Sequence, residues 1–411
     1  MTSTIDIFLE CDVYIRVNFE KIYTSTLHFS LLIFNFPYIM PYTVRFVNPQ
    51  KHYQRYRKEY LAILDDVLAR GDYIMRKDLE MFERRIARLV GTRYAVGLNS
   101  GTDALSFSFA AMGLKPQDEV ITVAHTFMAS ISAIAHHGAT PVLIDVGKDF
   151  TIDAAQIKQA ITKKTKAIEV VHLNGRLSDM EAVMAIARKH KLYVVEDAAQ
   201  ALGAKMKMKN GSWKMAGSFG VTGCFSMYPF KSLGCFGDGG IVTTDDAEVA
   251  HTIQLLRYNG EDRKTRKFYL HGHTALLDNI QAAILNVKLP HFPKWIARRQ
   301  AIANLYQKGL AEVSQVVVPH FEDPRFFDTY QNYVIRAKKR DKLVAFLSKK
   351  GVETLISWET PNYKQPLLQP NSLVLPETET ICKEVVSLPM YPELEDEDVN
   401  YVTNAIREFY R

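Results

Sequence analysis

The sequence predicts an α/β protein built on a mostly parallel, doubly wound sheet of seven strands, with a smaller C-terminal α/β domain. Short apolar runs of strand length recur at 94–98, 119–122, 140–144, 167–171, 193–196, 224–226 and 240–243. Helical apolar spacing lies between them, at 104–112, 130–136, 154–161 and 180–190. Strands that alternate with helices indicate crossover connections, and ligands then bind beyond the carboxyl ends of the strands.

Helical segments flank this alternating region. From Tyr53 to Val90 the apolar residues repeat at helical spacing, with a break at Gly71-Asp72. Further helical segments at 278–289 and 295–310 lead into the C-terminal part. The 411 residues suffice for two domains. We place them at 41–289, which holds the N-terminal helices and the large ligand-binding domain, and at 290–411.

The first 40 residues differ from the rest of the chain. Residues 22–44 contain no Asp, Glu, Lys or Arg, and 31–36 are nearly all apolar. Polar residues and prolines interrupt the stretch, so a membrane anchor is the weaker interpretation. A basic start and a cleavage site of small residues are both missing, which argues against a signal peptide. We expect residues 1–40 to be a non-essential leader, with Met40 as the true start.

Composition excludes several classes of protein. The net charge is +6, and no block of Lys and Arg resembles a nucleic-acid-binding arm. The four cysteines form no C-x-x-C pair, so we expect neither a metal site nor a disulfide framework. Reduced thiols fit a cytoplasmic protein, and we expect no membrane and no nucleic acid among its partners.

Two loops that follow predicted strands carry polar residues. Ser100-Gly101-Thr102 precedes a helix, where glycine permits close approach of a ligand and free N–H groups attract an anion. An ordinary helix cap explains this loop equally well. Asp197 ends another strand and is followed by small residues, which places an acid at the expected cleft. A simple capping role is the alternative here too.

Lys231 occupies an unusual environment. Phe230, Pro229, Leu233 and Gly234 surround it in the sequence. A lysine cation is costly to bury among such residues. Exposure at the surface is one explanation. An aldehyde cofactor is the better one, because burial lowers the pKa of the amine and a Schiff base uses the neutral form.

Five motifs, taken in order and with their spacing, resemble the DegT/DnrJ/EryC1/StrS aminotransferase family. They are Ser100–Leu105, Val195–Gln200, Phe225–Gly234, Gly237–Gly240 and Ser387–Leu394. The resemblance runs from about residue 46 to the C-terminus. It implies a fold-type-I transferase dependent on pyridoxal 5'-phosphate (PLP), similar to aspartate aminotransferase. It also implies a homodimer with active sites shared between the subunits.

The resemblance assigns roles to three residues near the reacting centre. Lys231 matches the lysine that forms the Schiff base with PLP and then shuttles a proton. Asp197 matches the acid that keeps the pyridine nitrogen protonated, so that the ring accepts electrons. Gln200 matches a residue near the 3-hydroxyl or the face of the ring.

Other positions match the contacts that hold the cofactor. Gly101, Thr102 and Ser226 match the phosphate-binding cup. Phe127 matches an aromatic residue that stacks on the ring, although an ordinary core phenylalanine is an alternative.

Two segments depart from the family pattern. Many members carry Gly-x-Asn-Ser-Arg where this chain has Thr274 and Leu276 after Gly272, so the cross-subunit phosphate contact is in doubt unless the Thr274 hydroxyl replaces it. A C-terminal segment that often bears a substrate-contacting histidine has Trp358 and Tyr363 instead. We take these two aromatic residues as candidate substrate contacts.

The stretch 257–277 is rich in charged and aromatic residues and shows neither strand nor helix periodicity. A loop of this length is usually functional or disordered. We expect it to line the neighbouring subunit's site, with Arg263 and Arg266 contacting a substrate diphosphate. A solvated surface loop is the alternative.

The predicted function is therefore amino-group transfer from an amino acid, expected to be L-glutamate, to a nucleotide-linked keto sugar in amino-sugar and cell-surface polysaccharide biosynthesis. A keto-inositol is an alternative acceptor. A PLP-dependent sugar dehydratase is disfavoured, because a histidine replaces the lysine in those relatives. A non-catalytic regulatory protein would not need Lys231, Asp197 and Gln200 together.

Overall fold

The computed structural model describes residues 4–9, 13–18, 42–319, 323–368 and 373–411, in two compact units, Met1–Pro41 and Tyr42–Arg411. In the first unit, β1 (Thr4–Leu9) pairs antiparallel with β2 (Val13–Asn18). Met40, the expected start, lies outside the described residues. Among the described residues, no helix combines the length and apolarity that a membrane span requires.

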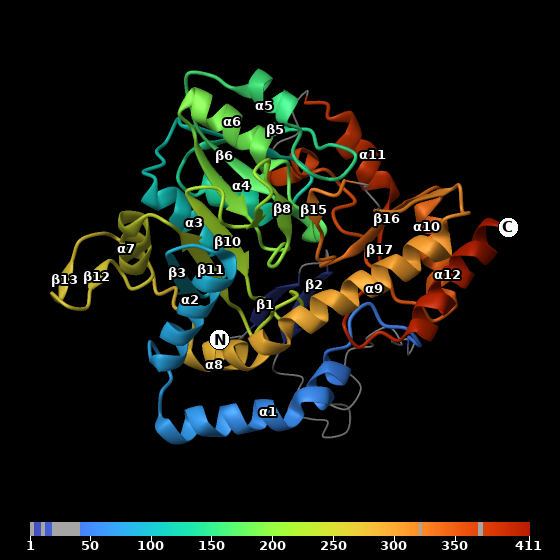
Figure 1. Cartoon of the computed structure of the whole chain (residues 1–411), viewed down its shortest axis with the longest axis horizontal. Coiled ribbons are helices and arrows are strands. Elements are labelled where there is room, and N and C mark those ends of the chain that lie inside the picture. Colours follow the sequence, from blue (N-terminus) through green and yellow to red (C-terminus); the bar gives the residue numbers. More distant parts are fainter. Residues whose placement is uncertain (1–3, 10–12, 19–41, 320–322, 369–372) are drawn as a thin grey trace. The chain divides into compact units, whose positions relative to one another are not determined.

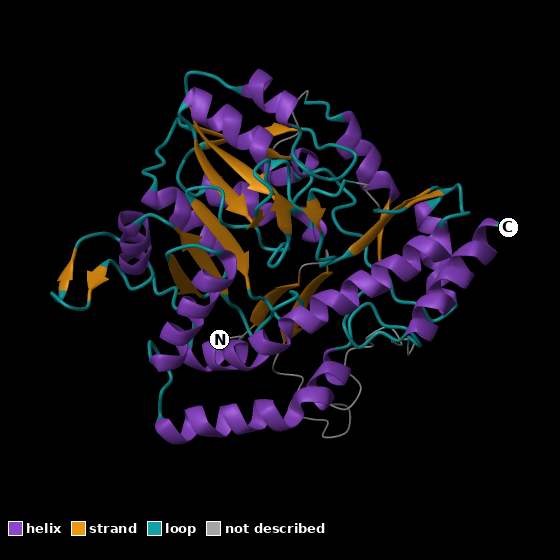
Figure 2. Ribbon diagram, in the orientation of Figure 1, coloured by secondary structure: helices purple, strands orange, loops and turns teal. Residues whose placement is uncertain are grey.

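The second unit is organised around a seven-stranded sheet with helices on both faces (Figures 1 and 2). The strand order is β3-β11-β10-β7-β6-β4-β5, and only β11 runs against the others. All seven predicted strands form, as β3 (Tyr94–Leu98), β4 (Glu119–Val123), β5 (Thr140–Ile144), β6 (Thr165–Val171), β7 (Tyr193–Asp197), β10 (Thr222–Ser226) and β11 (Gly240–Thr244). The mostly parallel sheet is thus confirmed.

Helices on the two faces enclose separate apolar cores. One core joins the sheet to α3 (Gly101–Ala111), α4 (Met128–Ala135) and α7 (Ala247–Leu256). The other joins it to α2 (Lys77–Val90), α5 (Ala154–Ala160), α6 (Met180–His190) and α8 (Asn279–Lys288). Because both faces are covered, the strands read as continuous apolar runs rather than as alternating patterns.

The predicted helical region 53–90 forms two helices. They are α1 (Pro49–Arg70) and α2, and Gly71 ends the first in the left-handed conformation, with φ of 65°. Glycine adopts this conformation without strain, which explains the break read from the sequence.

The C-terminal part has its own core. Three antiparallel strands, in the order β14-β16-β17, pack with α9, α10 and α12. The bounds are β14 (Val316–Val317), β16 (Tyr333–Ala337), β17 (Val385–Leu388), α9 (Phe292–Leu310), α10 (Arg340–Lys349), α11 (Pro376–Glu384) and α12 (Asp396–Tyr410). Short 3-10 helices lie at Leu173–Gly175, Leu289–His291, Asn362–Lys364 and Pro366–Leu368.

A small three-stranded sheet connects the C-terminal part of the chain to the part that contains the large sheet. Its strands are β15 (Phe326–Phe327), β8 (Lys205–Lys207) and β9 (Trp213–Met215), in that order. It fixes the chain just before β16 against a segment that follows β7. This placement brings residues 329–332 close to the carboxyl ends of the large sheet's strands.

Candidate active site

Residues at the ends of three strands and at the starts of two helices come together at the carboxyl ends of the strands of the large sheet. Gly101 begins α3 directly after β3, and Ser226 is the last residue of β10. A Cβ atom added to Gly101 would lie 2.9 Å from the Ser226 Cβ, so a larger residue would push β10 away. The Ser100 hydroxyl accepts a hydrogen bond from the Asp103 N–H at 3.0 Å and caps α3. The structure therefore brings Gly101, Thr102 and Ser226 together at a helix N-terminus, which suits an anion.

Asp197 ends β7 and is held in place from two sides. Its side chain is only 6% exposed. One carboxylate oxygen accepts from the Ser130 hydroxyl at 2.8 Å, and the other accepts from the Ala199 N–H at 3.1 Å. The Thr126 and Ser130 hydroxyls are in turn 2.8 Å apart. Two donors hold the carboxylate fixed while leaving lone pairs for a further partner.

Lys231 lies in the loop Tyr228–Gly234 that follows β10, which we call the lysine loop. Its backbone N–H donates to the Tyr228 carbonyl at 2.9 Å. Burial lowers the pKa of the amine, and the charge of Asp197 partly opposes that shift. Among the described residues, the Lys231 Nζ has no hydrogen-bond or ion-pair partner. A half-buried amine with this electrostatic balance is poised to act as a nucleophile.

Gln200 and Phe127 complete the predicted set. The Gln200 amide oxygen accepts from the Asn174 N–H at 2.8 Å, on the loop that follows β6. Phe127 caps α4, and 62% of it is exposed. The alternative of a core phenylalanine is therefore wrong. An exposed aromatic ring one turn before Ser130, which contacts Asp197, is free to stack on a planar ligand.

Trp358 and Tyr363 pack against residues that precede Phe127 in the chain, His125 and Ala124 respectively. The Trp358 ring meets the His125 ring edge-on, with 5.3 Å between their centroids. Tyr363 is 2% exposed, and its hydroxyl donates to Glu379 at 2.7 Å. Both residues thus contact or adjoin the segment that carries Phe127, and their direct contact with a substrate stays a prediction.

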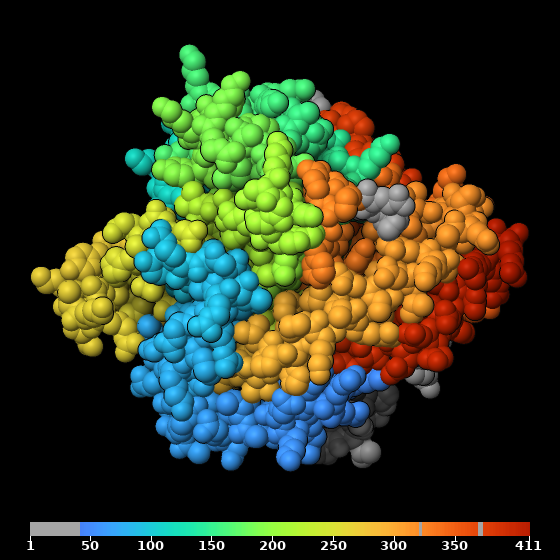
Figure 3. Space-filling view, viewed as in Figure 1, coloured from blue at the N-terminus to red at the C-terminus, as the bar shows by residue number. Residues whose placement is uncertain are grey.

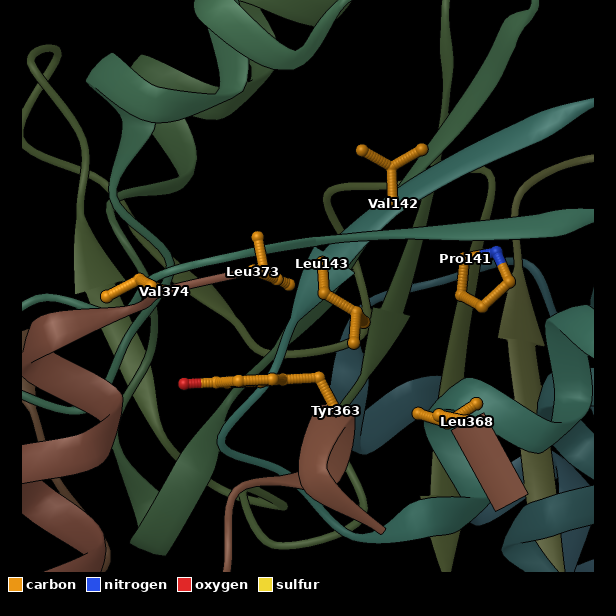
Figure 4. Close-up of a pocket in the computed structure, with 7 residues that line it drawn as sticks. All are labelled: Pro141, Val142, Leu143, Tyr363, Leu368, Leu373 and Val374. Atoms are coloured by element: carbon orange, nitrogen blue, oxygen red, sulfur yellow. The ribbon is translucent and has the colours of Figure 1, made fainter. Parts of the chain in front are cut away.

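A large apolar cavity of about 640 Å³ lies elsewhere, at the outer edge of β5 (Figure 4). Figure 4 shows Tyr363 among its lining residues, which are Pro141, Val142, Leu143, Tyr363, Leu368, Leu373 and Val374. Strands β4 and β6 separate β5 from Asp197 on β7. The cavity is therefore distinct from the site around Lys231.

Arg263 and Arg266 lie between strands β12 and β13, in a segment that projects from the rest of the molecule in Figures 1 and 3. The stretch predicted to lack regular structure forms a hairpin of β12 (Glu261–Asp262) and β13 (Lys267–Phe268), so that part of the prediction is wrong. Two-residue strands are too short to leave a periodic signal. Arg266 pairs with Glu261 at 3.3 Å. Among the described residues, no hydrogen bond or ion pair joins the hairpin to the lysine loop.

Several residues of the site escaped the sequence analysis. Ser130 holds Asp197 from α4, and no local motif marks it. Glu169, on β6, is fully buried, and neither of its carboxylate oxygens has a hydrogen-bond partner in the described structure. Burial and the neighbouring charge of Asp197 raise its pKa well above the ordinary value. A charged residue within an apolar strand was the available signal.

A second buried lysine lies beside the lysine loop. The Lys288 Nζ donates to the Gly234 carbonyl at 2.5 Å and lies 4.4 Å from the centre of the Phe236 ring. Burial lowers the pKa of Lys288 to about 8. Its amine is already engaged with a carbonyl and an aromatic ring, which distinguishes it from that of Lys231.

The fold and the site define a class of aminotransferase. Residues 54–407 match the DegT/DnrJ/EryC1/StrS aminotransferase family, and the chain belongs to it. A solved structure from Streptomyces venezuelae, DesV in complex with a ketimine intermediate, superposes with a TM-score of 0.86 at 37% identity. That comparison covers 90% of this chain and 99% of DesV, and it confirms the predicted fold class.

Two relatives are similar over nearly their whole length. The dTDP-3-amino-3,4,6-trideoxy-alpha-D-glucose transaminase of Streptomyces venezuelae is 37% identical over 89% of this chain and 96% of its own. The pleiotropic regulatory protein of Geobacillus stearothermophilus is 41% identical over 88% of this chain and 97% of its own.

Proposed function

We propose that the protein transfers an amino group from L-glutamate to a nucleotide-linked keto sugar, with PLP as cofactor. The observation that carries this proposal is the Lys231 amine. It is half-buried, and it has no hydrogen-bond or ion-pair partner among the described residues. Burial lowers its pKa, and the charge of Asp197 partly opposes that shift. Amino-group transfer needs such an amine beside an anion that holds a proton on the cofactor ring.

The residues present fit PLP. The close approach of Gly101 to Ser226, at the start of α3, offers N–H and hydroxyl donors to a phosphate. Asp197 offers a fixed carboxylate to a ring nitrogen, and Phe127 offers an exposed ring for stacking. These groups thus match a phosphorylated aromatic cofactor at three separate points, and Lys231 supplies the amine that an aldehyde requires.

When bound, PLP supplies an aldehyde that condenses with amines and a ring that delocalises negative charge. Lys231 would hold the cofactor through Nζ. Burial lowers the pKa of the Lys231 amine and so favours its neutral form, and the Nζ would take up the proton from the α-carbon of the amino acid. Asp197 would hold a proton at the ring nitrogen. Overall, the amino acid becomes a 2-oxo acid and the keto sugar becomes an amino sugar.

The transaminase relative supports a dTDP-linked or similar keto sugar as the acceptor. That relative is a transaminase named for a dTDP-linked 3-amino sugar, and the corresponding acceptor of an amino group is a keto sugar. The mild excess of positive charge suits two phosphate-bearing ligands. We further propose a cytoplasmic homodimer in which the β12–β13 hairpin reaches the partner's site. Its exposed Phe268 and Tyr269, at 68% and 55%, support burial against a second subunit.

The regulatory relative supports a second candidate, a non-catalytic regulator. The visible spectrum of purified protein separates the two. With glutamate, a transaminase loses the absorbance band of the lysine-bound aldehyde and gains the band of the amine form. A panel of nucleotide-linked keto sugars and keto-inositols, added next, should restore the first band for the true acceptor. Persistence of the original band with glutamate and with other amino acids would favour the regulator.

A further inference from the structure

The Gln331 side chain forms hydrogen bonds with the lysine loop on both sides of Lys231. The Gln331 amide oxygen accepts hydrogen bonds from the Ser232 N–H at 2.5 Å and from the Ser232 hydroxyl at 2.7 Å. Its amide nitrogen donates to the Phe230 carbonyl at 2.9 Å. The residues before and after Lys231 are therefore fixed by one side chain, which lies 99 positions beyond Ser232 and is only 7% exposed.

Gln331 is itself held firmly by the C-terminal core. The Arg299 guanidinium, buried on α9, donates to the carbonyls of Tyr330, Gln331 and Met390, each at 3.1 Å. Burial lowers the pKa of Arg299 to about 10, so it remains charged at neutral pH. A charged donor makes stronger hydrogen bonds than a neutral one. The backbone of Gln331 is thus fixed relative to α9 before its side chain reaches the lysine loop.

The same segment contacts the other side of the site. Thr329 N–H donates to the Gly175 carbonyl at 2.9 Å, and the Asn332 amide lies 3.4 Å from the Asn174 side-chain oxygen. Asn174 in turn donates its N–H to Gln200. Residues 329–332, which we call the strap, therefore connect the C-terminal core to both the lysine loop and the Gln200 side.

We infer that Gln331 is a positioning residue that sets the direction of the Lys231 side chain, and that the strap couples the lysine to the C-terminal core. The catalytic consequence rests on the proposed aminotransferase function, whereas the positioning does not. A glutamine is needed because its amide accepts from Ser232 and donates to Phe230 at once. A glutamate keeps the acceptor, loses the donor and brings a negative charge to the residues that flank Lys231.

The test compares Gln331→Leu and Gln331→Glu with a matched control, Gln300→Leu. Gln300 donates to the Asp328 carbonyl at 3.0 Å, next to the strap, and makes no hydrogen bond to the lysine loop. Hydrogen exchange of a peptide spanning the lysine loop is measured by mass spectrometry on full-length protein, with and without PLP. We expect exchange at the Ser232 amide to accelerate about fivefold or more in Gln331→Leu, and not in the control.

Kinetics and spectra give the second readout. Gln331→Leu should lower kcat for the glutamate half-reaction about tenfold with little change in KM. Gln331→Glu should shift the pH dependence of the cofactor absorbance to higher pH, because the added charge favours the protonated lysine. Unchanged exchange in Gln331→Leu, or equal acceleration in Gln300→Leu, would overturn the inference. If Gln331→Leu does not fold, an unshifted pH dependence in Gln331→Glu overturns it. Faster exchange in a protein that never transaminates supports positioning and refutes the proposed function alone.

Discussion

Replacing Asp197 with asparagine removes a charge while keeping the local hydrogen bonds. The asparagine oxygen can still accept from the Ala199 N–H, as the carboxylate does at 3.1 Å. Its nitrogen can donate to the Ser130 hydroxyl, which then donates to Thr126, 2.8 Å away. Because every partner is retained, we expect Asp197→Asn to fold with a thermal midpoint close to that of the wild type.

The expected loss of activity follows from the lost charge. A hydrogen bond to a charged group contributes about 1.5–3 kcal/mol. With about 1.4 kcal/mol per factor of ten in rate, the loss of this contribution alone lowers kcat roughly 10- to 150-fold. Ser130→Ala is the matched control. It removes one hydrogen bond to Asp197 and keeps the charge, so its loss in kcat should be clearly smaller.

The assay is a single-turnover measurement of the glutamate half-reaction, followed by absorbance with saturating PLP. Cofactor content is measured in parallel, because the phosphate cup of Gly101, Thr102 and Ser226 should survive the substitution. Asp197→Asn with full cofactor content and a rate within threefold of the wild type would refute the role of the carboxylate. A Ser130→Ala loss as large as that of Asp197→Asn would show that geometry, rather than charge, matters.

Three further predictions concern stability, the leader and the dimer. Native Glu169 keeps a proton that the unfolded chain releases, so stability falls as pH rises from the unfolded to the folded pKa of this group. Glu169→Gln should remove this loss, gaining about 1.4 kcal/mol over the wild type per pH unit in that window, as urea unfolding at several pH values would show; a pH-independent difference would contradict it. A truncated protein starting at Met40 should be soluble and as active as the full chain, and an inactive truncation beside an active full-length protein would count against a dispensable leader. Mixing Lys231→Ala subunits with subunits altered at both Arg263 and Arg266, each inactive alone, should restore one working site per mixed dimer; no recovery in proven mixed dimers would exclude a cross-subunit role for the hairpin.

The sequence predicted the large sheet well because its strands are buried on both faces. Runs such as 167–171 and 193–196 are apolar at nearly every position, and helices of clear periodicity separate them. Polar residues at the ends of those strands, including Asp197, therefore stood out. Lys231 stood out for the same reason, since it interrupts an apolar loop.

Periodicity and local motifs do not predict contacts between segments that lie far apart in the sequence. Gln331 and Ser232 are 99 positions apart, and no motif near either residue predicts a contact between them. The burial of Tyr363 depends on Glu379 and on neighbours in another part of the chain. The short hairpin at 261–268 and the exposure of Phe127 likewise follow from tertiary packing, which periodicity does not encode.

The proposal that Lys231 carries the cofactor can be tested by trapping the Schiff base chemically. Purified protein loaded with PLP is reduced with borohydride and digested, and the modified peptide is identified by mass spectrometry. The rival is Lys288, a buried lysine whose pKa is also lowered, to about 8, but whose amine donates to the Gly234 carbonyl. We expect the label on Lys231, and a label on Lys288 or on any other lysine would contradict the assignment of the Schiff base to Lys231.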